Sequence, residues 1–145
     1  MSAAPLRLGL AGLGTVGIGV VKIVQAHADL IAARAGRPVA ITAVSARDRT
    51  KNRDADLSGY AWETDPVALA TREDIDVFVE VMGGHEGAAK HATEAALAAG
   101  KHVVTANKAL LAHHGQALAE AAEVANLALR FEAAVAGGIP VIKAL

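Results

Sequence analysis

A Gly-x-Gly-x-x-Gly run at residues 12–17 constrains the fold of this chain more than any other feature of its sequence. It follows a short apolar segment, Leu6–Ala11, and precedes a stretch in which apolar side chains recur at helical spacing. A glycine-rich turn that joins a strand to a helix is typical of a site where a diphosphate lies against bare main chain. In this interpretation Gly12 makes the tight turn, Gly14 leaves room for the diphosphate and Gly17 lets the helix pack closely on the strand.

The start of the helix after this run offers hydrogen-bond donors to an anion. The backbone amides of Thr15, Val16 and Gly17 are expected to face the diphosphate, because a helix N-terminus carries unpaired N–H groups and the positive end of the dipole. The alternative is an ordinary tight turn between a strand and a helix. The position of the run, between a predicted strand and a predicted helix, favours dinucleotide binding.

Strand-like and helix-like segments alternate along the chain. Because parallel strands need crossover connections, this order predicts an α/β fold, a Rossmann-type doubly wound parallel sheet with helices on both faces. Asp65 and Pro66 have the residue types of an N-cap and a first helical position. Gly115 is a potential break in the last helix, and residues 47–59 are predicted to form a surface loop. The predicted strands are 6–11, 39–46, 75–82, 102–105 and 127–132, and the predicted helices are 16–34, 66–71, 86–99 and 110–125.

The charge balance and the absence of cysteine exclude several classes of function. The chain has 14 Lys and Arg against 15 Asp and Glu, so no global field would gather nucleic acid or an anionic membrane. Without cysteine there is no disulfide, thiolate nucleophile or cysteine metal site. Residues 1–10 lack the apolar core of a signal peptide, and no window reaches the ~18 consecutive apolar residues of a membrane span. The expectation is a soluble cytoplasmic protein with a small-molecule ligand.

A cluster of basic residues directly follows the second predicted strand. NAD-binding domains usually carry an acidic residue there, which accepts hydrogen bonds from the adenosine ribose, whereas this chain has Arg47. A guanidinium can hold a phosphate through two hydrogen bonds, so the sequence favours NADP, with its 2′-phosphate, over NAD. The alternatives are NAD, with Asp48 on a ribose hydroxyl, and a plain solvated loop. Three further basic residues add positive charge nearby: Arg49, Lys51 and Arg53.

Three further segments carry longer motifs: Val-Met-Gly-Gly at 81–84, Thr-Ala-Asn-Lys-Ala-Leu-Leu at 105–111 and Glu-Ala-Ala-Val-Ala-Gly-Gly-Ile-Pro at 132–140. Together with the glycine run, they make the chain resemble the homoserine dehydrogenase family nearly from end to end. The resemblance implies an NAD(P)-dependent oxidoreductase that interconverts L-homoserine and L-aspartate 4-semialdehyde, a step in threonine and methionine biosynthesis.

The resemblance also implies a division of the chain. Residues 1–132 would form the dinucleotide-binding domain, and residues 133–145 would begin a catalytic domain that is truncated here. In that family the second domain holds most substrate contacts and the main dimer interface, so the full-length protein is expected to be a homodimer. This chain alone is expected to bind cofactor with little or no turnover.

The motifs place further site residues just beyond the carboxyl ends of predicted strands, where open parallel sheets bind ligands. Gly83 and Gly84 are expected to let the nicotinamide ribose lie against the backbone, with Asn107 beside them. Lys108 is expected both to contact the cofactor and to be the catalytic residue, because a cation there can orient a carboxylate or help to move a proton. The alternative for Lys108 is a plain surface lysine.

The last motif implies a site for a monovalent cation such as sodium. By the resemblance, Glu132 would give its carboxylate, and Val135, Gly137 and Ile139 would give backbone carbonyls. Oxygen ligands suit a hard cation, and a structural role is expected rather than a catalytic one. The alternative is an ordinary glutamate at the end of a strand, beside a tight glycine turn.

Other function classes stay open at this point. The glucose–fructose oxidoreductase-like family shares the glycine run and a Gly-Lys-His-Val strand, but it then shows Glu-Lys-Pro where this chain has Asn107-Lys108-Ala109. Aspartate-semialdehyde dehydrogenase needs a cysteine nucleophile, which this chain lacks. A Rossmann module that senses a nucleotide without reducing it is the alternative that is not an enzyme.

Overall fold

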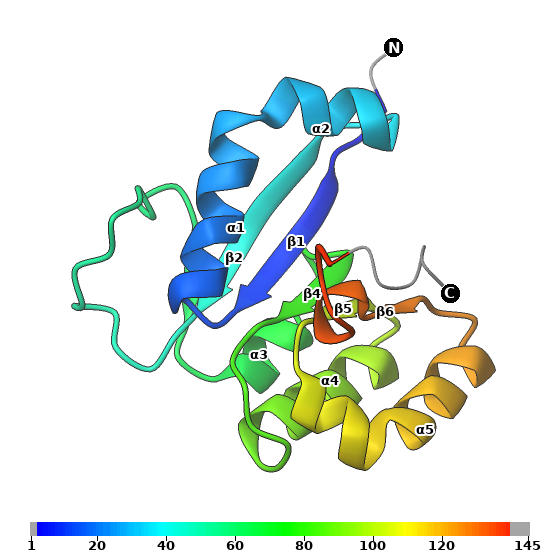
Figure 1. Cartoon of the computed structure of the whole chain (residues 1–145). Helices are drawn as coiled ribbons and strands as arrows, with labels where there is room; N and C mark the ends of the chain where they lie inside the picture. Colours follow the sequence, from blue (N-terminus) through cyan, green and yellow to red (C-terminus); the bar gives the residue numbers. More distant parts are fainter. Residues whose placement is uncertain (1–2, 140–145) are drawn as a thin grey trace.

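The computed structural model describes residues 3–139, which form a parallel six-stranded sheet in the order β3-β2-β1-β4-β5-β6 (Figure 1). The chain builds β1, β2 and β3 in one direction across the sheet and then returns to place β4 on the other side of β1. The direction of winding therefore reverses between β1 and β4. The strands are β1 (Leu6–Ala11), β2 (Val39–Ser45), β3 (Ala61–Glu63), β4 (Val77–Glu80), β5 (His102–Thr105) and β6 (Leu129–Arg130).

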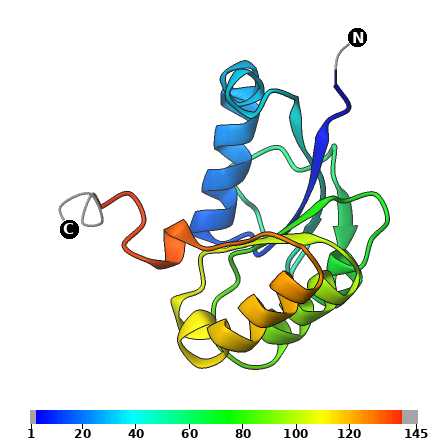
Figure 2. The same cartoon turned by 90° about the vertical axis from the view of Figure 1, so that its right-hand side faces the viewer.

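Helices cover both faces of the sheet, which confirms the predicted doubly wound architecture (Figures 1 and 2). One core lies between α1 and the sheet and contains Leu10, Val21 and Val44. The other lies under α3, α4 and α5 and contains Phe78 and many alanines, whose small side chains let helices and sheet approach closely. The helices are α1 (Thr15–Ala26), α2 (Ala28–Ala35), α3 (Pro66–Ala70), α4 (Ala88–Ala98) and α5 (Lys108–Val124), followed by the short 3-10 helix η1 (Glu132–Ala134).

The single helix predicted over residues 16–34 is wrong, because the chain bends by 86° at His27 and forms α1 and α2. The twelve residues of α1 span about 18 Å, close to the length of the six-residue strand β1, whereas one unbroken helix would extend beyond the sheet. Within residues 3–139 no single helix is long and apolar enough to cross a bilayer, although this bent pair reaches the length and apolarity together.

Other element boundaries show where local patterns were sufficient. Asp65 caps α3 as predicted, since its carboxylate accepts the Val67 amide at 2.9 Å. The third predicted strand, 75–82, is shorter than expected, because only the residues of β4 pair with a strand on each side. Gly115 does not interrupt α5. The predicted strand at 127–132 is reduced to β6, with Glu132 in η1, and the short edge strand β3 was not predicted.

Candidate functional site

The turn after β1 lies tightly against the end of β4. Gly12 has a left-handed backbone (φ +102°) and donates its amide to the Ser45 carbonyl at 2.9 Å. A Cβ atom at Gly12 would lie 2.8 Å from the carbonyl group of Val81. Both the backbone conformation and the lack of space therefore require glycine at this position.

The other two glycines of the run have opposite surroundings. A Cβ atom at Gly17 would lie 1.9 Å from the Gly12 carbonyl oxygen, so the first turn of α1 can approach Gly12 this closely only with a glycine at position 17. At Gly14 the same atom would meet nothing within 4 Å, which leaves open space over the start of α1. No described side chain caps this helix, and its first turn contains no acidic residue. Its first amides are therefore available to an anion.

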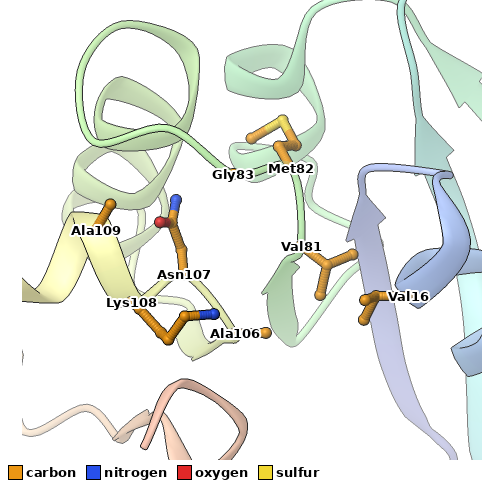
Figure 3. A pocket seen from close by; sticks show the side chains of 8 residues that line it. All are labelled: Val16, Val81, Met82, Gly83, Ala106, Asn107, Lys108 and Ala109. Carbon is orange, nitrogen blue, oxygen red and sulfur yellow. The ribbon is translucent and has the colours of Figure 1, made fainter.

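Two adjoining cavities lie at the carboxyl ends of the strands, where the winding reverses. The larger, of about 630 Å³, is lined by the glycine turn, the end of β2 and residues of the 46–53 loop. The smaller, of about 300 Å³, lies between Val16 and the start of α5 (Figure 3). Val81, Met82 and Gly83 line both cavities, so the two adjoin at the switch point, the usual place for a ligand of such a sheet, and we call them together the groove.

The Asn107-Lys108 pair forms one wall of the smaller cavity. The side-chain oxygen of Asn107 accepts the Leu110 amide at 3.0 Å and caps α5, and its Nδ2 donates to the Gly84 carbonyl at 2.5 Å. Lys108 is the first residue of α5, is exposed, and extends its ammonium group toward the end of β4 (Figure 3). The structure therefore places Lys108 at the groove rather than on a remote surface.

The basic loop lies at the opposite end of the groove. Arg47, Lys51 and Arg53 all line the larger cavity. The Arg53 Nε donates to the Leu13 carbonyl at 3.2 Å, which ties this loop to the glycine turn, and its guanidinium lies 5.6 Å from the centre of the Trp62 ring. One oxygen of Asp48 accepts the hydroxyl and the amide of Thr50, at 2.7 and 2.8 Å. These hydrogen bonds lower the Asp48 pKa.

The structure thus gathers most of the predicted cofactor residues around one groove. Thr15 and Gly17 are the exceptions, since neither lines a cavity. The residues that line at least one of them are Gly12, Gly14, Val16, Arg47, Gly83, Gly84, Asn107 and Lys108.

Residues 12–132 match the family model described as "Homoserine dehydrogenase, NAD binding domain". The chain belongs to this homoserine dehydrogenase family. It is 47% identical to the homoserine dehydrogenase of Neisseria gonorrhoeae over 97% of its own length, and 44% identical to that of Bacillus subtilis, again over 97%. It covers 32% of each relative, so this chain spans about a third of the curated relatives it matches.

Solved homoserine dehydrogenase structures have the same fold. The structure from Thiobacillus denitrificans superposes with a TM-score of 0.88 at 41% identity, covering 99% of this chain and 33% of that one. The S. aureus structure at pH 7.5 gives a TM-score of 0.82 at 39% identity, covering 91% of this chain and 34% of that one. Residues 12–132 are therefore a nicotinamide-cofactor domain of the homoserine dehydrogenase type.

The segment that follows β6 in this homoserine dehydrogenase domain contains the predicted cation ligands. Glu132 accepts the Gly138 amide at 3.2 Å through its side chain and the Val135 amide at 3.1 Å through its carbonyl, which folds the segment into a loop. Gly137 packs against Ala133, where a Cβ atom would lie 2.7 Å from the Ala133 Cα. Among the other three predicted ligands, Val135 is the one that contacts Glu132, and Ile139 is the last residue that the structure describes.

Two polar residues of the site were missed at the level of sequence. Glu80 and Thr105 are both fully buried and hydrogen-bond to each other at 2.7 Å, at the ends of adjacent strands β4 and β5. A signal for Glu80 was available, because it is the one charged residue in the apolar run Val77–Glu80. Charged residues are rarely buried unless their hydrogen bonds are satisfied.

The histidines near the groove form no metal site in the described part of the chain. His85 stacks on His113 with ring centres 4.1 Å apart, and His114 Nε2 lies 2.7 Å from a carboxylate oxygen of Glu86. This hydrogen bond lowers the pKa of Glu86. The contacts join the loop after β4 to α5.

Proposed function

We propose that this chain binds NADP and that the full-length protein is an NADP-dependent homoserine dehydrogenase, which interconverts L-homoserine and L-aspartate 4-semialdehyde. One observation carries the proposal: the glycine turn, the Gly83-Gly84 turn and the Asn107-Lys108 pair line two adjoining cavities at the switch point. Membership of the homoserine dehydrogenase family supplies the reaction. Because the chain spans a third of its relatives, turnover is proposed for the full-length protein only.

The groove has a distinct place for each part of the cofactor. The diphosphate would lie over Gly14, where there is open space and where the first amides of α1 are unpaired. The nicotinamide, which supplies or accepts the hydride, would lie in the smaller cavity beside Gly83. Lys108 would orient the substrate there and hold or move the proton of its hydroxyl group, since its ammonium group extends into this cavity.

The preference for NADP is supported by the charge at the far end of the groove. Arg47 and Lys51 line the cavity next to the end of β2, where the 2′-phosphate would lie. Asp48, the alternative partner of a ribose hydroxyl, already uses one oxygen within its own loop. A phosphate is therefore better matched at this end than a free 2′-hydroxyl.

Titration of the chain with NADPH and NADH, followed by cofactor fluorescence, tests the proposal. Arg47→Ala should weaken NADPH about tenfold or more, because charge-assisted hydrogen bonds contribute about 1.5–3 kcal/mol, and should leave NADH unchanged. Arg34→Ala, at the exposed end of α2, is the matched control and should change neither affinity. Equal affinities of the unmodified chain for the two cofactors would remove the case for NADP.

We also propose a monovalent cation, such as sodium, at the Glu132 loop, with carbonyls of Val135, Gly137 and Ile139 as further ligands. The closed loop and the chemistry of an all-oxygen donor set support this assignment. The thermal unfolding midpoint of the chain should be higher in sodium chloride than in choline chloride at equal ionic strength. Glu132→Gln should abolish this difference. Equal midpoints for the unmodified chain would contradict a sodium site.

The division of the full-length protein is proposed as well. Residues 1–132 would be the cofactor domain and residues 133–145 the start of a substrate domain, in a cytoplasmic homodimer. The lengths of the relatives support a large additional part. Sedimentation of the full-length protein should give a dimer, and this chain alone should show no homoserine turnover.

A further inference from the structure

Glu80 occupies an unusual position for a carboxylate. It is fully buried at the last position of β4. Its hydrogen-bond partners in the described part of the chain are neutral donors: the Met82 amide at 2.7 Å and the Gly83 amide at 3.3 Å on Oε1, and the Thr105 hydroxyl at 2.7 Å on Oε2. Burial of a charge is costly unless such donors compensate it.

The hydrogen bonds of Glu80 belong to a closed ring. The Thr105 hydroxyl donates to Glu80 and accepts the Asn107 amide at 3.0 Å. The Asn107 side chain donates to the Gly84 carbonyl, and the adjacent Gly83 amide returns to Glu80. The ring therefore joins the turn after β4 to the start of α5 across two neighbouring strand ends.

The turn that this ring holds consists of two glycines with left-handed backbone conformations. Gly83 and Gly84 both have φ of +84°, and a Cβ atom at either would meet nothing within 4 Å. No side chain packs where their Cβ atoms would lie, and the turn is held by the hydrogen bonds from the Gly83 amide to Glu80 and from Asn107 to the Gly84 carbonyl. Gly83 and Asn107 both line the smaller cavity (Figure 3).

We propose that Glu80 is a positioning residue for the nicotinamide half of the cofactor, an inference that rests on the proposed NADP function. Its two carboxylate oxygens set the width of the smaller cavity by holding the Gly83-Gly84 turn at a fixed distance from Asn107 and Lys108. Arg47 and Lys51, which would hold the 2′-phosphate, lie in the loop after β2 and have no part in the ring, whereas Gly83 and Gly84 line the larger cavity as well. Glu80 therefore acts on the part of the cofactor that passes the Gly83-Gly84 turn and on the nicotinamide, and not on the 2′-phosphate.

Two ligands separate the halves of the groove in a binding experiment on the full 145-residue chain. NADPH spans both cavities, whereas adenosine 2′,5′-bisphosphate reaches only the adenosine end. Glu80→Gln places an amide group where the ring needs an acceptor, so it should weaken NADPH at least fivefold and leave adenosine 2′,5′-bisphosphate within twofold of the unmodified chain. Thr105→Val should likewise weaken NADPH and leave adenosine 2′,5′-bisphosphate unchanged. Thr105→Ser, which keeps the hydroxyl, should bind NADPH as the unmodified chain does.

Each outcome decides the inference. Unchanged NADPH affinity in Glu80→Gln overturns it, and so does an equal loss for both ligands, since a general loss of structure would act on both ends. If Glu80→Gln does not fold, the two Thr105 variants decide alone. Equal NADPH affinities of Thr105→Val and Thr105→Ser would then refute the inference. An unmodified chain that binds neither ligand would refute the proposed function instead.

Discussion

Asp76 accepts three hydrogen bonds from Arg7, which is 69 residues away: its Oδ2 accepts the backbone amide at 2.9 Å and Nε at 3.1 Å, and its Oδ1 accepts Nη2 at 2.7 Å. The pair joins the start of β1 to the residue before β4. The guanidinium hydrogen bond and the neighbouring charge lower the Asp76 pKa to about 2. In the unfolded chain the pKa returns to about 3.9, so the pair stabilises the fold fully above about pH 4 and loses this effect as the pH falls toward 2.

Asp76→Asn should therefore lower the free energy of unfolding at pH 7 by about 1 kcal/mol, since both side chains are partly exposed. Urea unfolding at pH 7, 4 and 2 checks this, with the difference between the two proteins shrinking at the lowest pH. A difference that does not depend on pH would show that the charge of Asp76 is unimportant.

Gly14→Ala and Gly17→Ala should have opposite effects. Gly14→Ala should fold normally, because its methyl group meets only open space, but should weaken NADPH about tenfold or more by occupying the place of the diphosphate. Gly17→Ala should lose about 2 kcal/mol or more of stability, because its methyl group collides with the Gly12 carbonyl. Thermal unfolding and NADPH titration of both variants separate the two causes.

Gly19→Ala is the control for this pair, since Gly19 is inside α1 and its Cβ position is also open. It should stabilise the chain by about 0.5–1 kcal/mol through helix propensity and leave NADPH affinity unchanged. Loss of NADPH binding in Gly19→Ala would mean that the diphosphate lies farther along α1 than proposed.

Asn107 has two functions that substitutions can separate. Asn107→Ala removes the cap of α5 and should cost about 1 kcal/mol of stability, whereas Asn107→Ser keeps a capping oxygen and should retain stability. Both remove the donor to the Gly84 carbonyl, so both should weaken NADPH. Chemical denaturation combined with NADPH titration tests this, and full NADPH affinity in either variant would contradict it.

Lys108→Met in the full-length protein should reduce homoserine turnover by about 10²-fold or more, because the proposed proton-moving group is lost. The thermal midpoint should stay unchanged, since the Lys108 side chain is exposed. Steady-state kinetics with saturating NADP and a parallel melting curve provide the measurement. Wild-type turnover in Lys108→Met would show that Lys108 is a plain surface lysine without a catalytic role.

Local sequence patterns determined the elements of this protein and their order. The apolar run Leu6–Ala11 followed by the glycine run, and the Asp65-Pro66 start of α3, depend on residues a few positions apart, and the structure confirms these elements. The alternation of strands and helices was likewise sufficient for the parallel sheet. The roles of individual residues in cofactor binding stay predictions.

Only the tertiary structure decided which strand ends lie side by side and where each element stops. No glycine or proline marks the bend at His27 in the sequence. Instead, α1 ends where its length matches that of β1. Glu80 and Thr105 are 25 residues apart, and nothing local indicates that they hydrogen-bond. Contacts of this kind arise from the packing of distant segments, whereas sequence patterns report the conformation of neighbouring residues, and for that reason the groove emerged only with the fold.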